Sequence, residues 1–88
     1  MTTSTDELRI ELVLHAVLRE LAGNQVITLR LPAGTTAATA MAALVERHPA
    51  LAPHAGTVAF ARADAIIRPD ATLREGDRIE VLPPVSGG

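Results

Sequence analysis

The sequence predicts a single α+β domain, with a mixed sheet of four or five strands packed on one main helix and an extended C-terminal tail. Three observations predict this class. Apolar and polar residues alternate over residues 8–14 and again over residues 25–31, which is the period of a half-buried strand. Residues 37–47 contain five alanines and favour a helix. The chain has 88 residues, 48% of them hydrophobic, which suits one small core.

The first two strands are expected to form an antiparallel hairpin. They cover residues 8–14 and 25–31, and a proline follows the second. The short distance between them predicts an expanded hairpin loop. Within that loop, residues 16–23 are interpreted as a wide connection packed by its own leucines, Leu18 and Leu21, ahead of a Gly-Asn turn signal.

The main helix is expected over residues 37–47. Thr35 or Thr36 is the expected N-cap, because a threonine hydroxyl accepts a hydrogen bond from a free N–H of the first turn. Pro49 is expected to end the helix, since it cannot continue the backbone ladder. One helical face has the spacing of a buried stripe. That face consists of Met41, Leu44, Val45 and His48.

The second half of the chain is expected to be mainly strand. Residues 49–56 contain two prolines and a glycine and are expected to be a loop. Strands are predicted at residues 58–62 and, after a tight turn, at residues 65–67. A further turn places Gly76 at a positive φ. Residues 78–82 form the last strand, whose alternation weakens at its end, as expected where both faces become covered.

The order strand, strand, helix, strand, short strand, strand is that of the β-grasp fold, which ubiquitin shares. In that fold the last strand runs parallel beside the first, in the middle of the sheet. Residues 8–14 and 79–82 are apolar enough for central strands. The core is expected to be aliphatic, because Phe60 is the only aromatic residue.

Charge and composition exclude several classes of function. The formal net charge is −2, with eight basic and ten acidic residues, so there is no basic field for nucleic acid. No polybasic or amphipathic membrane anchor, signal peptide or membrane span is apparent, and a cytoplasmic protein is expected. There is no cysteine, and His15, His48 and His54 lack the spacing of a metal site, so no metal is expected.

The ends of the chain are expected to differ from its middle. Residues 1–6 are predicted to be a disordered leader, residues 7–82 the domain, and residues 83–88 a flexible reactive tail. The tail reads Pro-Pro-Val-Ser-Gly-Gly, and paired prolines favour a stiff, extended path. Six extended residues reach about 20 Å. A frayed, inert end is the alternative.

Covalent joining to another molecule is expected to use the C-terminus. All eight basic residues are arginine, so no side chain carries the amine of a lysine.

Three segments resemble a known family. They are Leu-Arg-Glu-Leu-Ala-Gly at residues 18–23, Leu-Arg-Glu-Gly-Asp-Arg-Ile at residues 73–79, and Leu-Pro-Pro-Val-Ser-Gly-Gly at residues 82–88. The chain resembles the ubiquitin-like sulfur carriers, and most closely the small (MoaD-type) subunits of molybdopterin synthase. It departs from the family pattern at four positions. The family often has aromatic residues where this chain has His15, Val81 and Leu82, and it commonly has an asparagine where this chain has Ala63.

The resemblance implies a chemical role for Gly88. Its carboxylate would be adenylated with ATP by an activating enzyme, converted to a thiocarboxylate, and used as a sulfur donor to the cyclic pterin precursor of the molybdenum cofactor. The chain itself would bind no cofactor and would not catalyse alone. The implied partners are the large catalytic subunit of molybdopterin synthase, the adenylating activating enzyme and, indirectly, a sulfur donor protein.

The other tail residues are expected to place Gly88 in a partner. Pro83 and Pro84 direct the tail, and Gly87 keeps the approach free of Cβ atoms. Val85 is either an apolar anchor in a partner's groove or the end of the core. Ser86 is expected only to satisfy local hydrogen bonds. Arg19, within the first matching segment, is a possible partner contact.

Three other functions remain open from the sequence. The first is a sulfur carrier for thiamine or cysteine biosynthesis, which has the same tail chemistry and a different downstream partner. The second is a ubiquitin-like protein modifier that is conjugated to target lysines through Gly88. The third is a plain interaction domain, for which the terminal glycines have no role.

Overall fold

A computed structural model describes residues 7–84 of the chain. The strands are β1 (Glu7–Leu14), β2 (Val26–Pro32), β3 (Ala59–Arg62), β4 (Ala65–Ile67) and β5 (Arg78–Leu82). The helices are α1 (Val17–Ala22), α2 (Ala37–Arg47) and a 3-10 helix, η1 (Pro49–His54). The predicted leader, residues 1–6, and the last four residues of the predicted tail, residues 85–88, lie outside the described residues.

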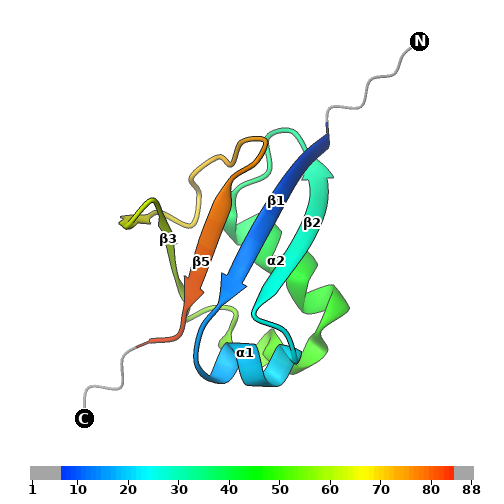
Figure 1. Cartoon of the computed structure of the whole chain (residues 1–88), viewed down its shortest axis with the longest axis vertical. Coiled ribbons are helices and arrows are strands. Elements are labelled where there is room, and N and C mark those ends of the chain that lie inside the picture. The colour runs from blue at the N-terminus through cyan, green and yellow to red at the C-terminus, as the bar shows by residue number, and fades with distance from the viewer. Residues whose placement is uncertain (1–6, 85–88) are drawn as a thin grey trace.

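The strands form one mixed sheet in the order β2-β1-β5-β3-β4 (Figure 1). β5 runs parallel to β1, with Leu12 opposite Ile79, whereas the other neighbouring pairs are antiparallel. The two central strands are therefore the first and the last of the chain. This confirms the predicted β-grasp order, including the initial hairpin and the parallel placement of the last strand.

The hydrophobic core lies between α2 and one face of the sheet (Figure 1). The inward residues of β1 and β5 are almost fully buried, and they are Ile10, Leu12, Leu14, Ile79 and Val81. Met41 and Leu44 of α2 pack there as predicted, together with Ala37 and Ala40, whose small side chains lie on the same buried face. Phe60 is also buried, as expected. Burial of this aliphatic surface is the main stabilising contribution to the fold.

The N-terminus of α2 is held by the connection that leads to β5. Thr36 is the N-cap, and its hydroxyl accepts a hydrogen bond from the N–H of Thr39 at 3.2 Å. Thr35 cannot take that role because it is buried and its own hydroxyl donates to the carbonyl of Pro32. The first free N–H groups of the helix, at residues 37 and 38, donate to carbonyls of the connection at residues 71 and 69. The helix start thus fixes the segment that precedes β5.

Two predictions of irregular structure were wrong. The expected wide connection at residues 16–23 is the helix α1, because fully buried Leu18 anchors it and Gly23 ends it in the left-handed conformation at φ 79°. Leu21, expected to pack inside, lies half exposed on α1. The expected loop at residues 49–56 contains η1, which starts at Pro49 and is anchored by buried Leu51. No helix in residues 7–84 is long and apolar enough to cross a membrane.

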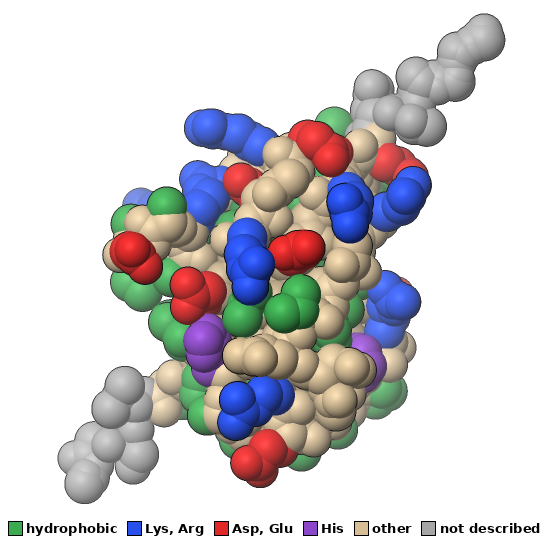
Figure 2. All heavy atoms as spheres, viewed as in Figure 1, with side chains coloured by type: hydrophobic (Ala, Val, Ile, Leu, Met, Phe, Trp, Pro, Cys, Tyr) green, Lys and Arg blue, Asp and Glu red, His purple; other side chains and the backbone are tan. Residues whose placement is uncertain are grey.

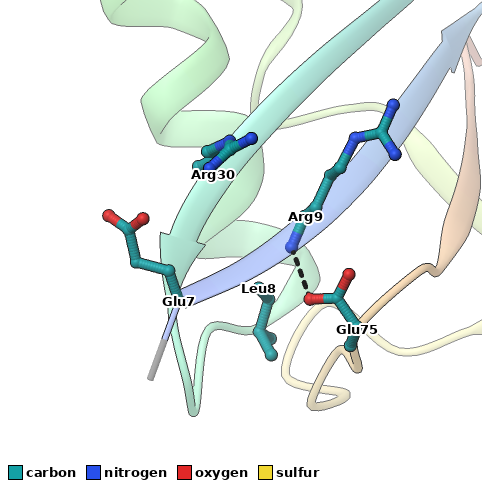
Figure 3. Close-up of a pocket in the computed structure, with 5 residues that line it drawn as sticks. All are labelled: Glu7, Leu8, Arg9, Arg30 and Glu75. Atoms are coloured by element: carbon teal, nitrogen blue, oxygen red, sulfur yellow. Dashed lines mark hydrogen bonds between the residues drawn. The ribbon is translucent and has the colours of Figure 1, made fainter. Parts of the chain in front are cut away.

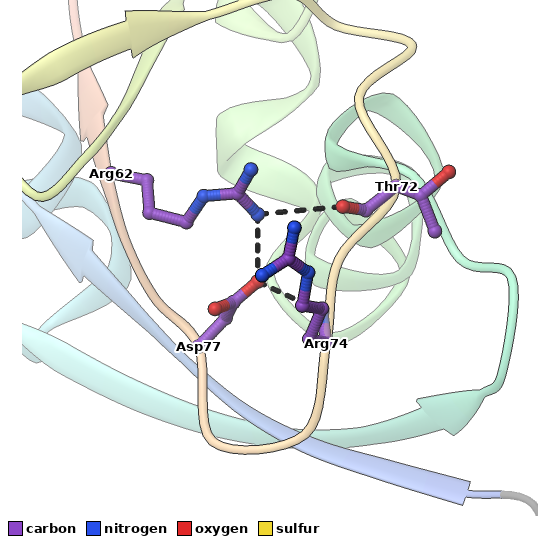
Figure 4. A network of polar contacts seen from close by, with 4 residues as sticks. All are labelled: Arg62, Thr72, Arg74 and Asp77. Carbon is purple, nitrogen blue, oxygen red and sulfur yellow. Dashed lines mark hydrogen bonds and ion pairs between the residues drawn. The ribbon is translucent and has the colours of Figure 1, made fainter.

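A polar network fixes the turn that begins β5 (Figure 4). Asp77 Oδ2 accepts hydrogen bonds from the backbone N–H of Arg74 at 2.8 Å and from Nη1 of Arg62 on β3 at 2.9 Å. The same Nη1 lies 3.4 Å from the carbonyl oxygen of Thr72. Gly76 has φ 82°, which confirms the predicted positive-φ turn. One carboxylate therefore ties the turn to the neighbouring strand.

Candidate functional site

The end of β5 is the attachment point of the C-terminal tail. β5 is paired on both sides, with β1 through residues 78–81 and with β3 through residues 80–82. The side chains of Ile79 and Val81 are fully buried between these neighbours and α2. The last strand is therefore held at both edges and through its core-facing side chains, so the tail starts from a fixed position.

The strand stops where the two prolines begin. β5 ends at Leu82, and Pro83 has no N–H with which to extend either ladder. Pro83 is half-buried and Pro84 is exposed, so the chain leaves the domain surface between them. Val85, Ser86, Gly87 and Gly88, the other predicted tail residues, lie outside the described residues. Gly88 is the fourth residue after Pro84, and four residues span at most about 14 Å.

The sheet face opposite α2 has no helix packed against it within residues 7–84 and divides into two halves (Figures 1 and 2). We call the half nearest the end of β5 the tail-side half. It consists of Val13, His15, Val26, Ala59, Ala61, Ile66, Glu80 and Leu82. One row of this half crosses all five strands, and its members are Val26, Val13, Glu80, Ala61 and Ile66. Apart from His15 and Glu80, the tail-side half is apolar, and Ile66 is 69% exposed.

We call the other end of this face the charged half (Figure 2). It consists of Glu7, Arg9, Glu11, Thr28, Arg30 and Arg78, with Glu75 from the adjoining turn. Glu75 Oε1 accepts a hydrogen bond from the backbone N–H of Arg9 at 3.0 Å (Figure 3), while the Arg9 side chain leads away from that carboxylate. Arg9 lies directly opposite Arg30. Glu7, Leu8, Arg9, Arg30 and Glu75 line an open hollow in this half, which carries both signs of charge (Figure 3).

Among the described residues 7–84, one polar side-chain contact lies within the tail-side half, and it was not foreseen from the sequence. Nε2 of His15 lies 3.0 Å from Oε1 of Glu80, and the two side chains are 35% and 39% exposed. No sequence motif links positions 65 residues apart. Only the predicted topology could have indicated the contact, because a parallel pairing of β1 and β5 brings the C-terminal ends of the two strands side by side.

Arg19, the predicted partner contact, is exposed on α1. Figure 1 shows α1 at the same end of the domain as the end of β5. Val17 and Leu21, one helical turn apart, are also exposed on this helix. The structure thus places Arg19 at the tail-bearing end, beyond the tail-side half of the sheet. Within residues 7–84, no three metal-ligating side chains cluster.

Comparisons of the sequence find a family and its members. The model of the ThiS family matches residues 12–88. The molybdopterin synthase sulfur carrier subunit of Arabidopsis thaliana is 31% identical over 84 residues, which cover 96% of this chain and 88% of that protein. The subunit of the same name from Chlamydomonas reinhardtii is 32% identical over 83 residues, which cover 92% of this chain and 100% of that protein.

Solved structures agree with the fold. The small archaeal modifier protein 1 (SAMP1) from Haloferax volcanii aligns with a TM-score of 0.77 and 28% identity, over 91% of this chain and 99% of that one. The structure of subunits 1 and 2 of the molybdopterin-converting factor of Helicobacter pylori in complex contains a chain that aligns with a TM-score of 0.61. That alignment covers 92% of this chain and 100% of the other at 22% identity, so it supports the fold alone.

Proposed function

The chain belongs to the ThiS family, and we propose that it is the sulfur carrier subunit of molybdopterin synthase. In this role its C-terminal glycine, Gly88, is adenylated, converted to a thiocarboxylate, and donates sulfur to the cyclic pterin precursor of the molybdenum cofactor. The curated relatives that share about a third of its residues carry this name.

One observation carries the proposal. The sequence Pro-Pro-Val-Ser-Gly-Gly continues directly from a central strand that is paired on both sides. Such a strand gives the tail a fixed origin, the two prolines stiffen its first residues, and the glycines keep its end narrow. These are the features needed to present a terminal carboxylate deep inside another protein's active site.

The chemistry requires activation before sulfur transfer. A terminal carboxylate is ionised at neutral pH and is a poor acyl donor. An oxygen of the Gly88 carboxylate attacks the α-phosphorus of ATP on an activating enzyme, which releases pyrophosphate and leaves an acyl adenylate. Sulfur from a donor persulfide then displaces AMP at the carbonyl carbon. Reductive cleavage of the S–S bond by a donor thiol leaves the thiocarboxylate on Gly88.

In this scheme the chain supplies a reagent and its position rather than catalytic side chains. Gly87 lets the backbone pass close to the walls of a partner's channel, and Val85 is available as an apolar anchor. The groups that catalyse transfer to the pterin belong to the large synthase subunit. The chain acts in the cytoplasm, where ATP is available, and binds no cofactor of its own.

The tail-side half of the sheet is the surface that such a partner covers. Gly88 lies within about 14 Å of Pro84, so a protein that encloses Gly88 also approaches the end of β5. Next to that end, the apolar residues Leu82, Ala59 and Ile66 are exposed or half-buried. Exposed apolar surface bordered by polar residues is typical of protein interfaces. We assign this half to the large synthase subunit.

Intact-mass spectrometry tests the proposal. The chain is incubated with ATP, the activating enzyme and a persulfide donor, and the expected product gains about 16 Da, the difference between sulfur and oxygen. Deletion of Gly88 is expected to abolish this gain. Ser86→Ala, a change in the same tail, is expected to preserve it. A product of unchanged mass from the full chain, with every component active on a control carrier, would refute the proposal.

Protein modification is a second candidate, favoured by the likeness to the small archaeal modifier protein 1 of Haloferax volcanii. In that case Gly88 forms isopeptide bonds with lysines of other proteins. The chain itself has no lysine, so it would be attached singly and never extended through its own side chains. The incubation with ATP, activating enzyme and persulfide donor also distinguishes a modifier from a sulfur carrier, because a modifier forms adducts on other proteins instead of a thiocarboxylate.

Co-purification distinguishes the proposed role from a sulfur carrier for thiamine or cysteine biosynthesis, because only the proposed role predicts that a large synthase subunit purifies with the chain.

A further inference from the structure

The His15–Glu80 pair is a polar feature in otherwise apolar surroundings. Glu80 lies opposite Val13 of β1 on one side and opposite Ala61 of β3 on the other. Val13 and Ala61 are only 6% and 7% exposed, whereas the Glu80 side chain remains 39% exposed. Glu80 is also three residues before Pro83, where the tail leaves the sheet. A carboxylate at this position will be covered by any protein that encloses the tail.

A strained turn holds His15 in place. Ala16 has φ 55° and ψ −128°, and the N–H of Leu18 donates to the carbonyl of His15 at 3.1 Å. Alanine thus takes a positive φ, a conformation that glycine normally occupies, in the turn that leads from β1 into α1. Such strain persists only where the surrounding structure imposes it, and it clusters at functional sites. The turn ends β1 so that the His15 ring lies beside β5, within hydrogen-bond distance of Glu80.

The pair retains unused hydrogen-bonding capacity. His15 Nε2 occupies one oxygen of Glu80, and no hydrogen bond within residues 7–84 engages Glu80 Oε2 or His15 Nδ1. A carboxylate oxygen only accepts hydrogen bonds. If a partner covers the pair with apolar side chains alone, these groups lose water and gain nothing, which weakens binding. A partner that aims an N–H or a cation at Glu80 replaces the lost water.

We propose that the His15–Glu80 pair determines which protein can dock on the tail-side half of the sheet. It selects a partner whose surface presents a lysine, an arginine or an amide N–H to Glu80, and it disfavours a partner with a wholly apolar surface. This inference rests on the proposed function, in which that partner is the large subunit of molybdopterin synthase. His15 acts as a positioning residue, because its ring nitrogen orients the carboxylate.

The experiment measures binding of the full chain and its variants to the large synthase subunit from the same source, by calorimetry. Glu80→Gln keeps the shape and removes the charge, and it is expected to weaken binding about 10-fold. His15→Phe removes the ring nitrogens and should have a similar effect. His15→Gln retains a donor for Glu80 and is expected to stay within about 3-fold of the wild type. The double variant His15→Phe with Glu80→Gln should lose little more than either single change, because both remove one interaction.

The matched control is Arg78→Gln, which breaks the Glu11–Arg78 pair (3.5 Å) in the charged half and is expected to change affinity less than 2-fold. Circular dichroism and urea titration report whether each variant is folded. Wild-type affinity in both Glu80→Gln and His15→Phe, with a thiocarboxylate still formed on the wild-type chain, would overturn this inference and leave the proposed function standing. Failure of the wild-type chain both to bind the large subunit and to form the thiocarboxylate would overturn both.

Discussion

The two halves of the exposed sheet face share strands but differ in composition. In the charged half the outward positions of β1, β2 and β5 carry three arginines, two glutamates, a threonine and, at the end of β2, Pro32. In the tail-side half, the same three strands carry Val13, Val26, Glu80 and Leu82. Because the sheet geometry is common to both, the difference lies in the side chains and in the position of the tail.

The difference indicates a division of roles across one surface. Charged side chains at the far end remain solvated and keep that end from associating, since charge on a sheet face opposes nonspecific contacts. Apolar side chains occur where a partner must approach to reach the tail. The half that lies nearest the tail is therefore the half suited to docking, and changes in it should alter binding more than stability.

The largest expected effect comes from placing charge in the tail-side half. Leu82→Asp puts a carboxylate beside the start of the tail, where a partner buries it in place of an apolar contact. We expect affinity for the large synthase subunit to fall at least about 100-fold, near 3 kcal/mol, the range of interface hot spots. Calorimetric titration measures the effect.

The matched control introduces the same residue in the charged half. Thr28 lies opposite Glu11 on the same sheet face, so Thr28→Asp changes the net charge by the same amount. Its effect on affinity should stay below about 3-fold. Equal losses in the two variants would mean that overall charge, rather than the tail-side half, controls docking.

The next largest effect concerns the fold rather than binding. Asp77→Ala removes the carboxylate that accepts from the Arg74 N–H and from Arg62, and the Asp77 side chain is only 16% exposed. We expect the free energy of unfolding in urea to fall by about 2 kcal/mol, as for hydrogen bonds with charged groups. Breaking the exposed Arg68–Asp70 pair by Arg68→Ala should cost at most about 0.5 kcal/mol. Similar losses of stability in Asp77→Ala and Arg68→Ala would show that Asp77 does not hold the turn before β5.

Much of this architecture could be predicted from local patterns. Alternation in β1 and β2, the alanines and flanking signals of α2, and the glycine turn before β5 each depend on a few neighbouring residues. The β-grasp order then followed, and with it the parallel placement of β5 beside β1. Strand boundaries shifted by about one residue, as at β2, which begins at Val26 rather than residue 25.

The parts that could not be predicted depend on long-range contacts. Nothing local distinguishes α1 from a packed loop, because its helical state depends on Leu18 reaching the core and on packing against η1. The His15–Glu80 pair joins residues far apart in sequence. The strained Ala16 was equally hidden, since alanine ordinarily indicates a helix and not a positive φ.

A smaller effect is expected from relieving that strain. Replacing alanine by glycine usually destabilises a protein by about 0.5–1 kcal/mol, because the unfolded chain gains freedom. At Ala16 the glycine also removes a strained φ, which costs about 1–3 kcal/mol for alanine. We therefore expect Ala16→Gly to raise the free energy of unfolding by about 1 kcal/mol. Ala42→Gly, at an exposed position of α2, should lower it by about 1 kcal/mol. If both variants lose stability equally in urea, Ala16 is not strained.

The smallest expected effect tests whether the charged half is only solvated surface. Arg9 and Arg30 lie directly opposite each other, and like charges in such pairs are destabilising. Because both side chains are exposed, Arg30→Gln should stabilise the fold by only about 0.3 kcal/mol at low salt. The gain should vanish in 1 M salt, where the screening length falls to about 3 Å. Arg19→Gln, with no arginine opposite, should give no gain at either salt concentration. A gain for Arg30→Gln that persists in 1 M salt would point to packing rather than charge repulsion between the two strands.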